Sequence, residues 1–172
     1  EKKINHFEIL KKAFNLNMFE VEEKDKNLLF NFINSVKEKN ESFKSQLYQD
    51  VFADYLIKNE DRKTFLEFGA TNGIDLSNTY SLEKYSNWIG VLGEPDPQWY
   101  ENLKKNRPKT KIITKCIWKK TGDTIDFLSS KNGVLSTIKS FRYSDKESMS
   151  VNSELRNKEF INIKIDTISL ND

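Results

Sequence analysis

The stretch TFLEFGATNG, residues 64–73, decides the fold that the sequence predicts. Its first five residues form a short apolar run, which is typical of a buried β-strand, and the run ends at Gly69. Gly69 and Gly73 allow a tight turn and let a ligand approach the main chain closely. The stretch therefore predicts a strand whose carboxyl end opens into a ligand-binding turn.

Strands and helices alternate beyond this turn. Residues 81–86 can form a helix, and a second apolar strand spans residues 88–93 and ends at Glu94. Asp96 suits a helix N-cap and Pro97 suits the first helical position, so a helix is expected that stops before Pro108. A third strand is expected over residues 111–117. This alternation indicates an α/β fold with a parallel sheet and flanking helices.

Three loops are expected to meet at one edge of that sheet. They cover residues 69–73, 94–95 and 115–117, and each lies at the carboxyl end of a predicted strand. Ligands of parallel α/β sheets bind outside the carboxyl ends of the strands. The sequence therefore predicts a binding site formed by these loops.

Both flanks of this core have their own patterns. Residues 1–42 are lysine-rich, with apolar residues at helical spacing, and are expected to form a helical segment before a domain of residues 43–172. A helix is expected over residues 46–58, capped by Ser45, with Leu47, Val51, Tyr55 and Leu56 on its apolar side. Beyond the third strand, residues 124–128, 134–138 and 161–165 are expected to be strands joined by polar turns.

Composition excludes several classes of protein. The net charge is only +2, from 28 basic and 26 acidic residues, which does not indicate nucleic-acid binding. The run Lys104-Lys105-Asn106-Arg107 is expected to place cations at a helix end, where they favour the helix dipole. A single cysteine excludes an intrachain disulfide and a thiolate metal cluster. No apolar run approaches the roughly 20 residues of a membrane helix, and a cytoplasmic location is expected.

The spacing of Glu94 points to a nucleoside. It follows Gly73 by about 20 residues, where an acidic side chain commonly accepts hydrogen bonds from ribose hydroxyls. The glycines read G-x-x-x-G and not G-x-G-x-x-G, which disfavours a dinucleotide, although a nicotinamide oxidoreductase remains an alternative. Glu67, two residues before Gly69, suits a ligand that carries a positive amino group. Each of these signals alone is weak.

A resemblance makes the prediction more specific. From Ser45 onward the sequence resembles the FkbM family of methyltransferases, most clearly as far as about Ser130. The residues that carry it are Ser45-Gln46-Leu47-Tyr48-Gln49-Asp50, Phe65–Gly73, Ser77-Asn78-Thr79-Tyr80, Leu82-Glu83, Trp88-Ile89-Gly90-Val91, Glu94-Pro95-Asp96-Pro97, Tyr100, Leu103 and Asn106-Arg107.

The resemblance implies a Rossmann-like methyltransferase fold, S-adenosylmethionine as cofactor and methyl transfer to a hydroxyl oxygen of a glycan or small molecule. Glu94 would hold the ribose hydroxyls and Pro95 would pack beside adenine. The other implied cofactor-binding residues lie near the methionine part (Glu67, Gly69, Ala70, Asn72, Gly73, Ser77, Asn78, Thr79), along the adenine (Cys116, Ile117), or on the preceding helix (Gln46, with Asp50).

Several of these residues have simpler interpretations. Ser77-Asn78-Thr79 can cap the next helix, and Gln46 and Asp50 can cap their own. Cys116 is expected to be a small buried hydrophobe, even as part of the pocket, and not a catalytic thiol. His6 lies outside the resemblance and is expected to be a surface or structural residue. The catalytic base stays unassigned, with Asp75 the candidate by position.

The resemblance covers only the N-terminal half of the family's domain. In the family, a helix and further strands follow the strand at residues 161–166, and residues 168–172 look like the start of that helix. Three explanations follow: residues missing from the chain as given, a natural short form, or a relative with another role. A non-catalytic cofactor-binding or interaction module is therefore the alternative function. A half sheet would expose an edge, which a homo-oligomer could cover.

Overall fold

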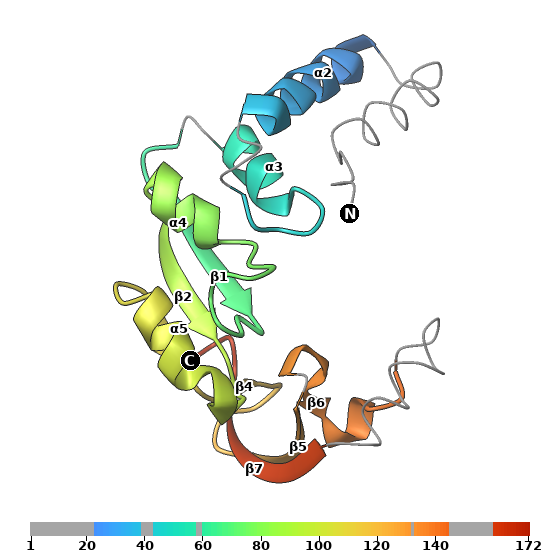
Figure 1. Cartoon of the computed structure of the whole chain (residues 1–172), viewed down its shortest axis with the longest axis vertical. Coiled ribbons are helices and arrows are strands. Elements are labelled where there is room, and N and C mark those ends of the chain that lie inside the picture. The colour runs from blue at the N-terminus through green and yellow to red at the C-terminus, as the bar shows by residue number, and fades with distance from the viewer. Residues whose placement is uncertain (1–22, 39–42, 58–59, 132, 145–159) are drawn as a thin grey trace. The chain divides into compact units, whose positions relative to one another are not determined.

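The computed structural model describes residues 23–38, 43–57, 60–131, 133–144 and 160–172. It is an α/β protein, whose helices and strands are labelled in Figure 1. Its contacts divide the chain into two compact units. One unit comprises residues 1–63 and 76–88, and the other comprises residues 64–75 and 89–172. The apolar residues expected at helical spacing between Ile4 and Phe14, and His6, lie outside the described residues.

The first unit is helical. It holds α2 (Glu23–Glu38), α3 (Gln49–Leu56) and α4 (Tyr80–Ser86). Val36 of α2 is fully buried and packs with Tyr48 and Val51, with Phe32 and Phe43 around them. The ring of Phe32 also meets Phe52 edge to face at 5.3 Å between centroids. The helical segment predicted over residues 1–42 is confirmed for residues 23–38, and the helix predicted over residues 81–86 is confirmed as α4.

The start of α3 differs from the prediction. The helix begins at Gln49 and not at residue 46, because the Asp50 carboxylate accepts hydrogen bonds from Ser45 Oγ at 2.6 Å and from the Lys44 amide. These bonds fold the preceding residues into a loop with Tyr48 in the left-handed region (φ 61°). Ser45 is therefore not the N-cap, and Leu47 points to solvent at 77% exposure. Leu56 is also exposed, whereas Val51 is buried as predicted.

The second unit contains the predicted parallel sheet. Its strands are β1 (Thr64–Phe68), β2 (Ile89–Gly93) and β3 (Lys111–Ile113), in the order β1-β2-β3, and all pair in parallel. β1 and β2 run in register from Thr64↔Ile89 to Phe68↔Gly93, so both strands end at the same edge. Ala70, Leu92 and Leu103 form the core that joins this sheet to α5 (Tyr100–Asn106).

The chain enters α5 as the sequence predicts. Asp96 accepts a hydrogen bond from the Gln98 amide, and Pro97 occupies the first turn of the short 3-10 helix η2 (Pro97–Trp99). α5 ends at Asn106, ahead of Pro108. One residue of the basic run at the end of α5 is buried. Arg107 is 2% exposed, and its Nη1 donates to Gly73 O at 3.1 Å.

A second, mixed sheet lies beyond β3. Its strands are β4 (Cys116–Ile117), β5 (Thr124–Ser130), β6 (Thr137–Ile138) and β7 (Phe160–Ile168), in the order β4-β7-β5-β6. β4 pairs in parallel with β7, while β5 is antiparallel to both β6 and β7. Figure 1 shows β7 as a long curved strand beside β5. Cys116, Phe127 and Ile165 form the core of this sheet.

Three predictions about this region are corrected. The single strand expected over residues 111–117 is two strands, because Cys116 and Ile117 pair with β7 and not with β2. The strand expected over residues 134–138 begins as a 3-10 helix, η3 (Gly133–Leu135), where Gly133 packs directly on the Trp99 ring. Where residues 168–172 are expected to start a helix, Ile168 ends β7 and residues 169–172 form a turn, closed from the Asp172 amide to Ser169 O.

Candidate functional site

A cavity of about 360 Å³ lies in the second unit, where the carboxyl ends of β1 and β2 meet the four-stranded sheet. The parallel sheet and its loops contribute Phe68, Gly69, Thr71, Gly93, Glu94 and Pro95 to its lining. The mixed sheet and the residues beside it contribute Lys115, Cys116, Ile117, Phe127, Gly133, Val134 and Ser136. Its volume is that of a small-molecule site. Residues of all three predicted loops therefore line one cavity, although Cys116 and Ile117 form β4 and not a loop.

Glu94 makes the hydrogen bonds that connect the turn after β1 to the loop after β2. Its side chain is only 3% exposed, and its Oε2 accepts a hydrogen bond from the Thr71 amide at 2.8 Å. The other oxygen, Oε1, accepts from the Asp96 amide at 2.8 Å. The backbone amide of Glu94 continues the β2–β3 pairing by donating to Ile113 O. Glu94 is therefore fixed in position by its backbone and by both carboxylate oxygens.

The electrostatics of Glu94 follow from its burial. Removal from water raises the pKa of its carboxyl above the ordinary 4.5, although the amides of Asp96 and Thr71 oppose the shift. The nearby Asp96 charge raises the Glu94 pKa further. A buried carboxylate that is held by amides and has a raised pKa at the edge of a cavity is the kind of group that functional sites contain.

The turn after β1 holds unusual backbone conformations. Gly69 and Gly73 have φ of 70° and 79°, as their predicted turn role requires. Thr71 also has a positive φ, 47°, which is rare for a β-branched residue. The amides of Gly69 and Ala70 both donate to Gly93 O, which fastens the turn to the end of β2. The strain at Thr71 thus coincides with the amide that binds Glu94.

Loop residues 72 and 73 are held from α5. Asn106 Nδ2 donates to Asn72 O at 2.8 Å, and Arg107 donates to Gly73 O. The side chain of Asn72 closes its own turn, accepting from the amides of Ile74 and Asp75 and donating to the Asp75 carboxylate. Asn106 and Arg107 therefore fix the glycine turn through the carbonyl groups of residues 72 and 73.

The structure brings five of the predicted cofactor-binding residues together around the cavity: Gly69, Glu94, Pro95, Cys116 and Ile117. Four others in the same unit are not among its lining residues. Ala70 is in the core with Leu92, and Asn72 closes the turn. Glu67 is buried at 8% exposure, and at Gly73 a Cβ would meet Leu103 and Arg107.

The remaining predicted residues, Gln46, Ser77, Asn78 and Thr79, belong to the helical unit. Ser77 Oγ accepts hydrogen bonds from the amides of Thr79 and Tyr80, so it binds the first amide of α4, whereas Thr79 at the N-cap makes no side-chain capping bond. Gln46 is exposed. Asp75, the candidate base, is exposed and accepts a hydrogen bond from Asn72.

Cys116 is a buried cavity-lining residue at 6% exposure. Burial and the nearby Glu94 charge raise the pKa of its thiol, so the thiolate that nucleophilic chemistry needs is disfavoured. This agrees with the prediction of a small buried hydrophobe. Among the described residues no group of three or more His, Cys, Asp or Glu side chains could hold a metal ion.

Sequence reasoning missed the wall of the cavity that the mixed sheet provides. Phe127 is on β5, and Gly133, Val134 and Ser136 are on or beside η3. These residues form no motif with the glycine turn. Phe127 is placed there by the pairing of β5 with β7, and residues 133–136 by contacts of Ser136 with Asp96 and of Gly133 with Trp99. The one available signal was the apolar strand itself, which indicated a buried position but not which site it bordered.

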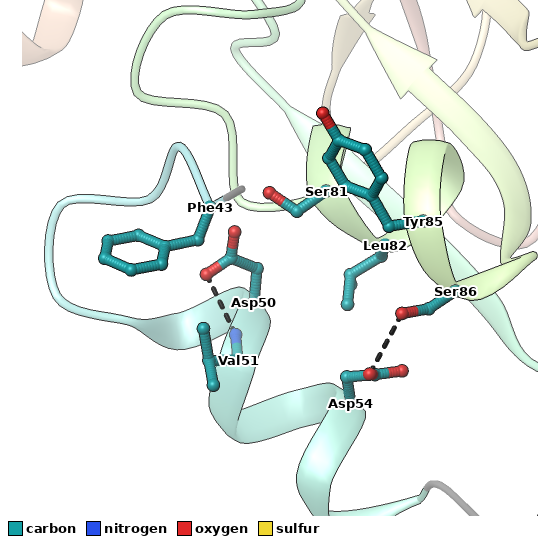
Figure 2. Close-up of a pocket in the computed structure, with 8 residues that line it drawn as sticks. All are labelled: Phe43, Asp50, Val51, Asp54, Ser81, Leu82, Tyr85 and Ser86. Carbon is teal, nitrogen blue, oxygen red and sulfur yellow. Dashed lines mark hydrogen bonds between the residues drawn. The ribbon is translucent and has the colours of Figure 1, made fainter. Parts of the chain in front are cut away.

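A second cavity, of about 200 Å³, lies in the helical unit between α3 and α4. Figure 2 shows Asp50 and Asp54 one turn apart on α3, with Ser81, Leu82 and Ser86 of α4 opposite them. Asp54 accepts hydrogen bonds from Ser86 Oγ and Trp88 Nε1 and pairs with Lys63 at 3.6 Å. Both carboxylates thus satisfy local donors and hold the unit together.

Within the part of the chain that the structure describes, every helix is too short or too polar to cross a lipid bilayer. No protein-family model, no curated protein and no solved structure matches the chain.

Proposed function

We propose that this protein is an S-adenosylmethionine-dependent methyltransferase of Rossmann-like fold, whose cavity at the ends of β1 and β2 binds the adenosine part of the cofactor. The observation that carries the proposal is the buried Glu94 carboxylate, fixed by the Thr71 and Asp96 amides at the edge of a 360 Å³ cavity. An acidic residue at the end of the second strand is the group that would accept ribose hydroxyls.

The chemistry of Glu94 suits a ribose. An ionised carboxylate has about four lone-pair sites on its two oxygens. The amides of Thr71 and Asp96 take one site on each oxygen, which leaves each oxygen able to accept one hydroxyl. Ribose presents two adjacent hydroxyls, so the arrangement supports a bidentate interaction.

The rest of the lining suits an aromatic base. Ile117, Phe127 and Val134 give the cavity apolar surface, and Pro95 lies next to Glu94. Planar rings bind well against such side chains, because apolar burial is favourable and aromatic contacts add to it. The predicted places of Pro95, Cys116 and Ile117 along adenine fit this lining, and Phe127 and Val134 extend it.

When bound, S-adenosylmethionine supplies a sulfonium methyl group that is already activated for transfer. The protein then has to bind the cofactor, orient an acceptor and exclude water. Glu94 and the glycine turn do the first of these. By the resemblance, the acceptor is a hydroxyl of a glycan or small molecule.

A cofactor-binding module without turnover is the second candidate. One observation favours it: among the described residues that line the cavity, Glu94 is the one carboxylate, and two amides already hold it. A group committed to hydrogen bonds with the backbone and ribose does not serve as a base for an acceptor hydroxyl.

Calorimetric titration of the full chain with S-adenosylhomocysteine tests the proposal. We expect saturable binding that NAD does not displace. A folded protein that binds no S-adenosylhomocysteine, or binds NAD more tightly, would overturn it. Transfer of a labelled methyl group to candidate acceptors separates the two functions, since the module without turnover gives no labelled product.

A further inference from the structure

Asp96 connects two parts of the cavity. Its side chain is fully buried, and its carboxylate accepts four hydrogen bonds. Two come from Gln98, through the amide at 3.2 Å and Nε2 at 2.8 Å. The others come from Ser129 Oγ at 2.9 Å and Ser136 Oγ at 2.6 Å. An N-cap alone needs only the first of these bonds, so the carboxylate has a larger role than its local sequence indicates.

Of the two distant partners, one lines the cavity and the other lies on the strand that contributes Phe127 to the lining. Ser129 is on β5, and Ser136 follows η3 and itself lines the cavity. Ser136 Oγ also accepts from the Ser130 amide, and Gln98 Nε2 also donates to Ser130 O. Asp96 therefore connects the loop that carries Glu94 to the end of β5 and to residues 133–136, which are called the wall below.

A second contact acts on the same wall. Gly133 lies against the Trp99 indole so closely that a Cβ at this position would overlap the ring. Trp99 follows Asp96 by three residues in η2. The wall is thus attached to the Glu94 loop at Ser136 by hydrogen bonds and at Gly133 by packing.

We infer that Asp96 is a positioning residue, which holds the wall of residues 133–136 in place and thereby sets the affinity of the cavity for its ligand. The identity of the ligand rests on the proposed function; the role of Asp96 does not. The Asp96 amide also donates to Glu94 Oε1, so its loop positions the proposed ribose acceptor as well.

The single cysteine offers a readout that needs no ligand. Cys116 lines the cavity and is 6% exposed, so a loosened wall should admit a thiol reagent. In Asp96→Ala we expect alkylation of Cys116 to accelerate about tenfold, since local opening exposes the thiol without global unfolding. Ser136→Ala, which removes one of the four donors, should give a smaller change in the same direction.

Leu103→Ala is the matched control. Leu103 is fully buried but packs with Ala70 and Leu92, on the α5 side of the parallel sheet. The Leu103→Ala substitution should lower global stability without changing a contact of residues 133–136. Any faster alkylation of Cys116 in this variant therefore measures global unfolding. Gly133→Ala should accelerate alkylation as Asp96→Ala does, because it disturbs the wall from the Trp99 side. It also keeps the test available if Asp96→Ala does not fold.

The binding arm uses S-adenosylhomocysteine and the full chain. We expect Asp96→Ala to bind about tenfold more weakly, the scale of one lost charged hydrogen bond. Faster Cys116 alkylation in a protein whose wild type binds no S-adenosylhomocysteine would retain the positioning role and reject the cofactor. Two results would overturn the role of Asp96. One is alkylation of Cys116 that is no faster in Asp96→Ala than in Leu103→Ala. The other is a wild type that binds S-adenosylhomocysteine and an Asp96→Ala variant that binds it equally tightly.

Discussion

The Thr71 amide donates to Glu94 Oε2 at 2.8 Å, across 23 residues of sequence. This bond joins the turn after β1 to the end of β2, the two places where the sequence predicts a ligand. The residue that donates this bond, Thr71, also has a positive φ of 47°. The candidate site is therefore assembled by main-chain geometry.

Burial of Glu94 predicts a pH dependence of stability. Its folded-state pKa is raised above the ordinary 4.5, so the folded protein holds the proton more tightly than the unfolded chain. The stabilisation is complete below about pH 4.5 and is lost as the pH rises through the folded-state pKa. Urea denaturation across this range should show that loss in the wild type. Glu94→Gln, which cannot titrate, should have a flatter profile; identical profiles would contradict the effect.

Gly73→Ala should destabilise the protein by about 2–4 kcal/mol. The substitution combines the cost of a positive φ, about 1–2 kcal/mol, with overpacking. A Cβ at Gly73 would lie 2.6 Å from Leu103 Cδ1 and 2.8 Å from Arg107 Cγ. Gly122→Ala is the control, since its φ is 86° but nothing lies within 4 Å of the added Cβ. Urea denaturation should give the larger loss at Gly73, and equal losses would argue against the packing described.

Arg107→Met should lower the free energy of unfolding by about 1–3 kcal/mol, the cost of an unsatisfied buried polar group. The substitution keeps a long side chain but removes the bond to Gly73 O and the contact with the Phe65 ring at 5.5 Å. Lys104→Met, on the exposed end of α5, should change stability by less than about 0.5 kcal/mol. If both variants lose the same small amount, Arg107 is an ordinary surface cation.

Trp88→Phe tests the helical unit. Trp88 is 5% exposed and its Nε1 donates to Asp54 Oδ1 at 3.0 Å. Loss of this donor to a buried carboxylate should cost about 1–3 kcal/mol. Trp118→Phe, at a half-buried residue whose ring packs on Phe141, should cost less. Chemical denaturation monitored by circular dichroism compares the two, and a larger loss at Trp118 would contradict the role given to Asp54.

Local patterns predicted the parallel sheet well. The runs that became β1 and β2, the Asp96-Pro97 start and the end of α5 depend on neighbouring residues, so the sequence carried them directly. Long-range pairing was beyond reach. Residues 111–117 look like one strand, and only the pairing of Cys116 with Thr167 of β7 divides them.

The candidate site also has a part that local sequence predicts and a part that depends on long-range strand pairing. The glycine turn and Glu94 were predictable, because strand ends in a parallel sheet meet at one edge. The opposite wall was not, since Phe127 and Ser136 reach the cavity through strand pairing within the mixed sheet. Asp96 was recognised only as an N-cap, because its serine donors lie 33 and 40 residues away.

The most direct test of the proposed function compares the S-adenosylhomocysteine affinity of the wild type with that of Glu94→Ala by calorimetry. Loss of the ribose hydrogen bonds should weaken binding by about 1.5–3 kcal/mol, the range for hydrogen bonds to a charged group. A folded Glu94→Ala protein that binds as tightly as the wild type, or a wild type that does not bind at all, would contradict it.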